Sequence, residues 1–167
     1  MYRFSVLIFF LILCFAHCKI QYTFSGINLT PDVKSFSVKY FPNRAPYVSP
    51  TLSQFFTEKL KDKFLDNTSL NLVNSNGHLT FEGVIKGYET RPMGIQADDK
   101  PASNRLTITI SVKFTNSKDP KASYETDFSR YADYPVGKDI KYVENQLNEE
   151  IVTLIVEDIF VKSVTNW

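Results

Sequence analysis

Alternation of apolar and polar residues is clearest over residues 105–115, which we expect to form a β-strand with one buried face. Apolar side chains occupy every second position of this segment, and polar side chains fill the positions between them. A period of two places all the apolar side chains on one face of a strand. The same alternation predicts a strand over residues 33–41. Shorter strands are expected over residues 20–25, 70–74, 78–88 and 123–130.

Two segments instead show the period of an amphipathic helix. In the first, apolar residues recur four positions apart, at Leu52, Phe56, Leu60 and Phe64. Ser49 and Pro50 precede them and suit an N-cap and the first helical position, so this helix is expected to end near Leu65. The second helix is expected over residues 141–164. Its apolar arc is wide, which fits either additional core contacts or contact with another protein.

The order of these elements predicts the fold class. Residues 75–77 (Ser-Asn-Gly) are typical of a hairpin turn between the strands at 70–74 and 78–88. A further turn at 116–120 leads into the last strand. One helix thus lies among hairpin-connected strands and a second closes the chain. We therefore expect an α+β fold, in which two helices pack on one face of a mostly antiparallel sheet.

Residues 89–104 show no periodicity and are expected to form a long loop between two good strands. Loops of this length inside small domains are uncommon and often functional. This segment contains Arg91 and Lys100, and Arg105 follows at its exit, with Met93 and Ile95 nearby. Cations beside apolar side chains would suit a phosphorylated amphiphile. The alternative is a mobile loop with ordinary surface charges.

The N-terminal residues have the pattern of an export signal. Arg3 precedes an unbroken apolar run over residues 6–16, which is shorter than the roughly 17–25 residues that a membrane-spanning helix needs. Cys18 follows two residues later. The pattern fits either ordinary secretion, with cleavage near residues 16–18, or a bacterial lipoprotein signal that is cut before Cys18 so that its thiol carries acyl chains. The remaining cysteine, Cys14, lies within this leader, so no internal disulfide is expected.

Composition argues against several classes of function. Losing Arg3 with the leader would reduce the 19 basic residues to 18, equal to the 18 acidic ones, and a nucleic-acid-binding protein should show a basic excess. His78 is the one histidine after the leader. The sequence shows no metal-ligand spacing and no glycine-rich phosphate loop. We therefore expect no enzyme activity, no metal, no other cofactor and no nucleic-acid partner.

Several segments between residues 18 and 167 resemble the LptE family of lipopolysaccharide-assembly lipoproteins, in the form found in Bacteroidetes-type bacteria. The segments, in chain order, are CKIQYTFSG, VKSFSVKYFPNRAP, PTLSQFFTEKLKDKF, LNLVNSNGHLTFEG, NRLTITISVKFTN, FSRYADY and IVEDIFVKSVTNW. Each segment alone is a weak motif. Together, in this order, they are fairly specific, and the match covers essentially all of residues 18–167. The resemblance implies a lipoprotein signal peptide over residues 1–17 and a single LptE-like domain over residues 18–167.

The resemblance also implies a function. Members of this family are acylated at the leader-boundary cysteine, here Cys18, and lie at the periplasmic side of the outer membrane. They bind and plug the β-barrel LptD, support its assembly and help to deliver lipopolysaccharide to the outer leaflet, without being enzymes. Arg91, Lys100 and Arg105 are the candidate lipopolysaccharide contacts. The alternatives are a stand-alone periplasmic lipoprotein that binds a small hydrophobic ligand and a secreted hydrolase built on serine and aspartate residues.

Overall fold

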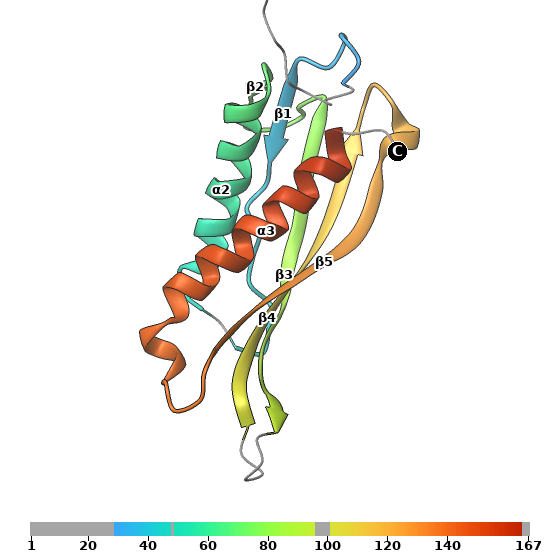
Figure 1. Cartoon of the computed structure of the whole chain (residues 1–167). Helices are drawn as coiled ribbons and strands as arrows, with labels where there is room; N and C mark the ends of the chain where they lie inside the picture. Colours follow the sequence, from blue (N-terminus) through green and yellow to red (C-terminus); the bar gives the residue numbers. More distant parts are fainter. Residues whose placement is uncertain (1–28, 48, 96–100, 165–167) are drawn as a thin grey trace, which may run out of the picture.

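The computed structural model describes residues 29–47, 49–95 and 101–164. Within these ranges the chain forms two helices and five strands, together with two single 3-10 turns, η2 and η3 (Figure 1). In chain order the elements are β1 (Ser35–Val38), α2 (Leu52–Asn67), β2 (Asn71–Leu72), β3 (Leu79–Ile95), β4 (Pro101–Asn116), η2 (Pro120–Ala122), β5 (Tyr124–Pro135), η3 (Ile140–Tyr142) and α3 (Glu144–Val164). The strand expected at residues 20–25 lies outside the described residues.

The strands form a single sheet in the order β2-β1-β3-β4-β5. Strands β3, β4 and β5 pair antiparallel, whereas β1 pairs parallel with both β2 and β3. Helices α2 and α3 lie side by side on one face of the sheet (Figure 1). The expected α+β fold, with a mostly antiparallel sheet and two helices on one face, is confirmed.

The core lies between the helices and the sheet. The alternating residues of β4 are buried on this face, as their pattern predicts, and contribute Leu106, Ile108, Ile110, Val112 and Phe114. Phe64 of α2 is at the centre of an aromatic cluster, with its ring centroid 5.4 Å from that of Phe36, 4.7 Å from Phe81 and 5.1 Å from Phe160. Each such contact adds to the hydrophobic burial of the rings, so this cluster joins β1, β3 and both helices.

The wide apolar arc of α3 is mostly core. Val152 and Val156, which lie beside the main apolar stripe, are buried, as is Phe160. Leu154, by contrast, is 44% exposed. Most of the arc is therefore explained by packing against α2 and the sheet, and Leu154 is the large apolar side chain of α3 that remains at the surface.

The predicted hairpin at residues 75–77 is wrong. Strands β2 and β3 do not pair with each other, because β1 lies between them and is parallel to both. Serine side chains of β1 hold the connecting segment: Gly77 N–H donates to Ser37 Oγ (3.3 Å) and His78 N–H donates to Ser35 Oγ (3.2 Å). Residues 75–77 therefore connect β2 to β3 across the end of β1. The pairing of β1 with both strands is not evident from the local sequence.

The start of the first helix also differs from the prediction. Its N-cap is Thr51 rather than Ser49, and α2 extends to Asn67. The Ser49 side chain is buried and accepts a hydrogen bond from Asn148 Nδ2 of α3 at 3.3 Å. The Ser49 hydroxyl, which an N-cap would use for the backbone of the helix, is therefore engaged in a tertiary contact with α3.

The predicted loop over residues 89–104 is wrong for residues 89–95 and 101–104, which belong to β3 and β4, whereas residues 96–100 lie outside the described residues. β3 and β4 remain paired almost to the end of their hairpin, so that Arg91 lies opposite Arg105 and Ile95 opposite Pro101. A register shift between Ile85 and Gly87 changes which positions face the core, and this shift interrupts the alternation of the sequence. The end of the hairpin extends past the helices, as Figure 1 shows, and residues 89–92 of β3 are exposed there, so burial no longer selects apolar side chains at these positions.

Among the described residues, no helix combines the length and the apolar character needed to cross a membrane.

Candidate functional site

The candidate site is the part of the β3–β4 hairpin that carries Arg91 and Arg105. These two residues lie directly opposite one another in the antiparallel register. Arg91 is well exposed, and its Nη2 donates to Oε2 of Glu89, two residues earlier on the same strand, at 2.7 Å. Such an exposed pair contributes at most about 1 kcal/mol, so the Arg91 guanidinium is available to another anion at small cost.

Arg105 is held more firmly than Arg91. Its Nε and Nη2 atoms donate to the two carboxylate oxygens of Asp133 on β5, at 2.7 and 2.9 Å. The guanidinium also lies 3.6 Å from the centroid of the Tyr131 ring. The hydrogen bond with Arg105 lowers the pKa of the Asp133 carboxyl, and Asp133 in turn raises the pKa of Arg105. Arg105 is therefore a fixed cation on a tyrosine surface, and a phosphate group would have to compete with Asp133 for it.

The other predicted site residues are not described by the structure. Lys100 and Cys18 both lie outside the described residues, so their roles remain predictions. Two residues that the sequence analysis missed are Tyr131 and Asp133. The predicted last strand stopped at Arg130, although the alternation continues, and following it to Pro135 would have placed both residues on the same face as Arg105.

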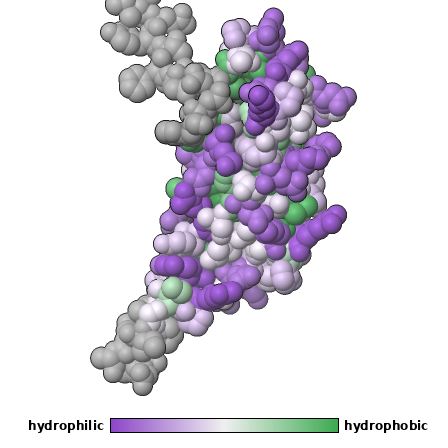
Figure 2. Space-filling model, turned by 90° about the vertical axis from the view of Figure 1, so that its right-hand side faces the viewer, coloured by the Kyte–Doolittle hydropathy of each residue, from purple (hydrophilic) through white to green (hydrophobic). Residues whose placement is uncertain are grey.

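The face of the sheet away from the helices carries matched charges. Lys39 and Lys113 both pair with Glu82, at 2.6 and 3.3 Å, and Lys86 pairs with Asp127. These hydrogen bonds lower the pKa of both carboxyls. Seen from the right-hand side of Figure 1, the molecular surface is largely hydrophilic and its hydrophobic areas are small and separate (Figure 2). Such a surface suits a polar, hydrated partner better than an apolar one.

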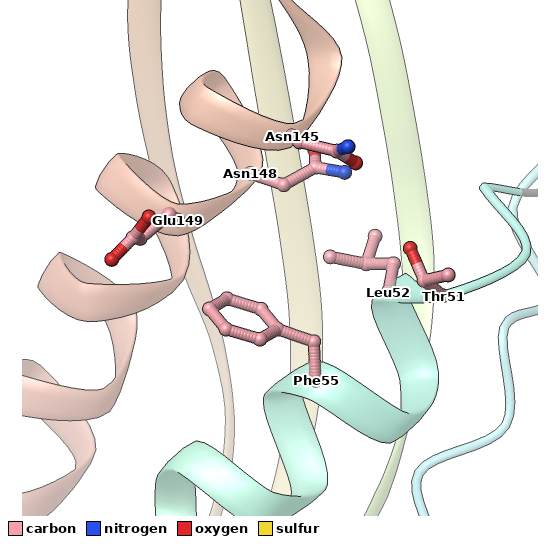
Figure 3. A pocket seen from close by; sticks show the side chains of 6 residues that line it. All are labelled: Thr51, Leu52, Phe55, Asn145, Asn148 and Glu149. Carbon is pink, nitrogen blue, oxygen red and sulfur yellow. The ribbon is translucent and has the colours of Figure 1, made fainter.

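A small cavity lies between the first turns of α2 and α3 (Figure 3). Its volume is about 210 Å³, and it is lined by Thr51, Leu52, Phe55, Asn145, Asn148 and Glu149. Two further cavities measure about 240 and 300 Å³, the former lined by Tyr47, Tyr88, Thr90 and Ile140. Ligand pockets usually measure about 300–1,000 Å³ and enclose most of the ligand. These cavities are at or below that range.

A partly buried polar network links Asn148, which lines the 210 Å³ cavity, to Tyr88, which lines the 240 Å³ cavity. The Tyr88 hydroxyl shares its one proton between two acceptors, Glu144 Oε1 at 2.9 Å and Asn148 Oδ1 at 3.2 Å, and Asn148 Nδ2 donates to Ser49 Oγ. Burial, followed by the hydrogen bond to Glu144, raises the pKa of Tyr88 well above its usual value. The hydroxyl thus keeps its proton to a higher pH than an exposed tyrosine does. The network joins α3 to β3 and to the segment before α2.

The described residues contain no arrangement typical of a metal site. No group of three or more histidine, cysteine, aspartate or glutamate side chains is placed to bind a metal ion within the described ranges. His78 accepts a hydrogen bond at Nδ1 from the backbone N–H of Lys34, at 3.0 Å. This contact ties His78 to the segment before β1, which is a structural role.

Comparison with solved structures shows the same fold in bacterial proteins of very different sequence. A hypothetical protein from Chlamydia trachomatis matches with a TM-score of 0.56 at 8% identity, over 80% of this chain and 99% of that one. A minor lipoprotein from Acinetobacter baumannii matches with a TM-score of 0.51 at 15% identity, over 76% and 89% of the two chains. The rare lipoprotein B from Shewanella oneidensis gives a TM-score of 0.50 at 8% identity, over 77% and 90%.

These likenesses define the class of the fold, a small α+β domain that also occurs in bacterial lipoproteins. The sequence makes the assignment more specific, because residues 33–163 match the profile of the LptE family, described as lipopolysaccharide-assembly. The chain belongs to this family, and its role is in lipopolysaccharide assembly. A search of the curated proteins finds no significant match.

Proposed function

We propose that this protein is a non-enzymatic lipoprotein of the outer membrane that binds and plugs an LptD-like β-barrel and supports its assembly. Acyl chains on Cys18 would tether it at the periplasmic side. The observation that carries the proposal is the match to the LptE family over residues 33–163, on a fold that contains each expected layer. One acyl chain binds a membrane only marginally, so a barrel partner would also supply the second contact that stable attachment needs.

The chemistry of the sheet surface supports a barrel partner. The wall of a wide barrel's interior is polar and hydrated. The open face of the sheet presents hydroxyl groups, such as those of Thr109 and Ser129 at 3.0 Å from each other, among charged pairs that are already matched. Most of this face can therefore be covered without burying unpaired charges, whose desolvation would weaken binding, and Glu125 is the carboxylate of this face for which the described residues provide no ion pair.

The exposed end of the β3–β4 hairpin supports direct contact with lipopolysaccharide. Arg91 is the best placed cation in the described part of this hairpin, because its ion pair with Glu89, the one formed among the described residues, is exposed. Arg105 would contribute through the fixed guanidinium above Tyr131. Lys100, which precedes β4 in the sequence, would be a third cation. Arginine forms paired hydrogen bonds with phosphate, which is the chemistry that this lipid offers.

The proposal is tested in cells that depend on this protein. Depletion should lower the amount of lipopolysaccharide reaching the outer leaflet, measured with an impermeant label, and the unmodified chain should restore it. The Cys18→Ser variant, with its signal intact, should restore it poorly because the tether is lost. Full restoration by an unacylated variant would contradict the tethering part of the proposal.

The alternative of a stand-alone carrier for a small hydrophobic ligand has weaker support. A carrier must enclose its ligand, and the cavities described above are small and open to solvent. Size-exclusion chromatography of the protein extracted from native membranes separates the two functions, since a carrier would elute as a monomer and a barrel partner as a large complex.

A further inference from the structure

The long free edge of the sheet is β5. Its pairing with β4 is uninterrupted, from Ser103 opposite Pro135 to Phe114 opposite Tyr124, and no strand of the described chain pairs with its other side. The opposite edge, β2, has only two residues. The backbone groups of a strand point alternately towards its two neighbours. About half of the N–H and C=O groups of β5 therefore face away from the sheet.

The edge lacks several of the features that usually block an exposed strand, although it does carry charged side chains. Natural edge strands are often short, bulged, or interrupted by proline or lysine. Between Tyr124 and Tyr134, β5 has no proline, no lysine and no shift in register. Its one basic residue, Arg130, is on the helix side, where Nε and Nη2 donate to Asp158 of α3 at 2.6 and 2.7 Å. This charge is already paired and does not prevent another strand from approaching.

The outward face of β5 is acidic. Successive residues of a strand alternate between faces, so Glu125, Asp127 and Asp133 share the face opposite the helices. Asp127 pairs with Lys86 and Asp133 with Arg105, whereas Glu125 makes no ion pair within the described part of the chain. A strand added beside β5 would thus lie along three carboxylates, and β5 itself offers no cation on that face.

We propose that β5 accepts an extended segment of another protein as a sixth strand, and that this segment carries lysine or arginine at alternate positions. Backbone hydrogen bonds would provide affinity, and the acidic row would select the charge of the segment. A second copy of β5 fits less well, because antiparallel pairing centred on Ser129 would put Glu125 beside Asp133. This inference goes beyond the proposed function and does not require that the partner be a β-barrel.

The test uses the full chain in detergent and three labelled twelve-residue peptides. In the first, lysine alternates with threonine and valine; in the second, glutamate replaces lysine; in the third, proline replaces the threonines and valines. We expect the lysine peptide to bind and to slow hydrogen exchange at alternate amides of β5, without changing α2. Equal binding of the glutamate or the proline peptide would overturn the proposal, as would protection confined to other elements.

Charge variants provide the matched control. Glu125→Lys should weaken binding of the lysine peptide by about fivefold, because an exposed ion pair is lost and a like charge is introduced. Glu150→Lys makes the same charge change on an exposed position of α3 and should leave binding unchanged. An equal loss in both variants would mean non-specific attraction and would overturn the proposal. Slow hydrogen exchange of β5 that appears without peptide and increases with protein concentration would also overturn the proposal, since it would show that a second copy of the chain pairs with β5.

Discussion

Arg91 and Arg105 lie directly opposite one another on β3 and β4, and each guanidinium is paired with a carboxylate of its own, Glu89 and Asp133 respectively. Like charges at opposite positions of a sheet destabilise it. The two acidic residues therefore allow two arginines to occupy adjacent positions on an exposed hairpin. This arrangement holds two cations close together, where an added anion could contact both.

The first prediction concerns Asp133. In Asp133→Asn, Arg105 loses its partner and the repulsion from Arg91 is no longer offset, so Tm should fall by roughly 2–4 °C at low salt. High salt should reduce the difference, because it screens exposed charges. Thermal unfolding followed by circular dichroism measures the change. Glu150→Gln, an exposed position of α3 without an ion pair among the described residues, serves as control and should not alter Tm.

The second prediction concerns the buried hydroxyl of Tyr88. Tyr88→Phe leaves Asn148 Oδ1 without its donor in the core, and the free energy of unfolding should decrease by about 1–3 kcal/mol. Tyr47→Phe is the matched control, since the Tyr47 ring packs on Tyr88 but remains 45% exposed. Denaturant titration compares the two variants. An equal effect of both would show that the network between Tyr88, Asn148 and Ser49 does not stabilise the fold.

The third prediction concerns alkaline pH. Burial raises the pKa of Tyr124 from 10.0 to about 12, against the opposing effect of its hydrogen bond with Ser163. The unfolded chain therefore releases this proton near pH 10, while the folded chain keeps it. Stability is full below pH 10 and falls between pH 10 and pH 12, with a slope of up to about 1.4 kcal/mol per pH unit for this group.

Tyr124→Phe tests the origin of that slope. Removing the phenol removes its share of the pH dependence, so the free energy of unfolding should decline less steeply above pH 10. Tyr142, which is 87% exposed, is the control, and Tyr142→Phe should leave the slope unchanged. The account of Tyr124 is contradicted if its substitution has no effect on the slope.

The fourth prediction compares two glycines. A Cβ atom at Gly83 would lie 2.0 Å from the carbonyl oxygen of Ser111 and 2.7 Å from the Phe41 ring, so Gly83→Ala should cost more than about 3 kcal/mol or prevent folding. Gly137 has φ +86° and open space around it, so Gly137→Ala should cost only about 1 kcal/mol of backbone strain. Soluble yield and denaturant titration measure both variants. Similar behaviour of the two would contradict the close approach of β3 and β4.

The sequence predicts the fold wherever one face of an element is buried. The alternation ending in Phe114 and the four-residue spacing from Leu52 to Phe64 place β4 and α2 correctly, because burial selects apolar residues at those positions. Non-local choices are less predictable. The turn at Gly77 has a hairpin sequence, but β1 pairs with β3 in place of β2. This pairing joins residues 43 positions apart and leaves little local signal.

The candidate site was predicted only in part. Arg91 and Arg105 lie close together as predicted cations, but they lie on paired strands and not on a loop. The sequence does not predict these strands, because the register shift after Ile85 interrupts the strand periodicity. Asp133 and Tyr131, which hold Arg105 in place, both lie on β5. The strand predicted from the sequence ends at residue 130, before both of them. Pairing across strands depends on register, which the sequence of a single strand does not specify.

The most direct test of the central proposal is to isolate the protein from its native outer membrane with mild detergent, after crosslinking, and to identify what accompanies it by mass spectrometry. We expect a large outer-membrane β-barrel in a one-to-one complex, and an acylated Cys18 at the start of the mature chain. A protein recovered as a monomer with an unmodified N-terminus, and without a barrel, would contradict the account.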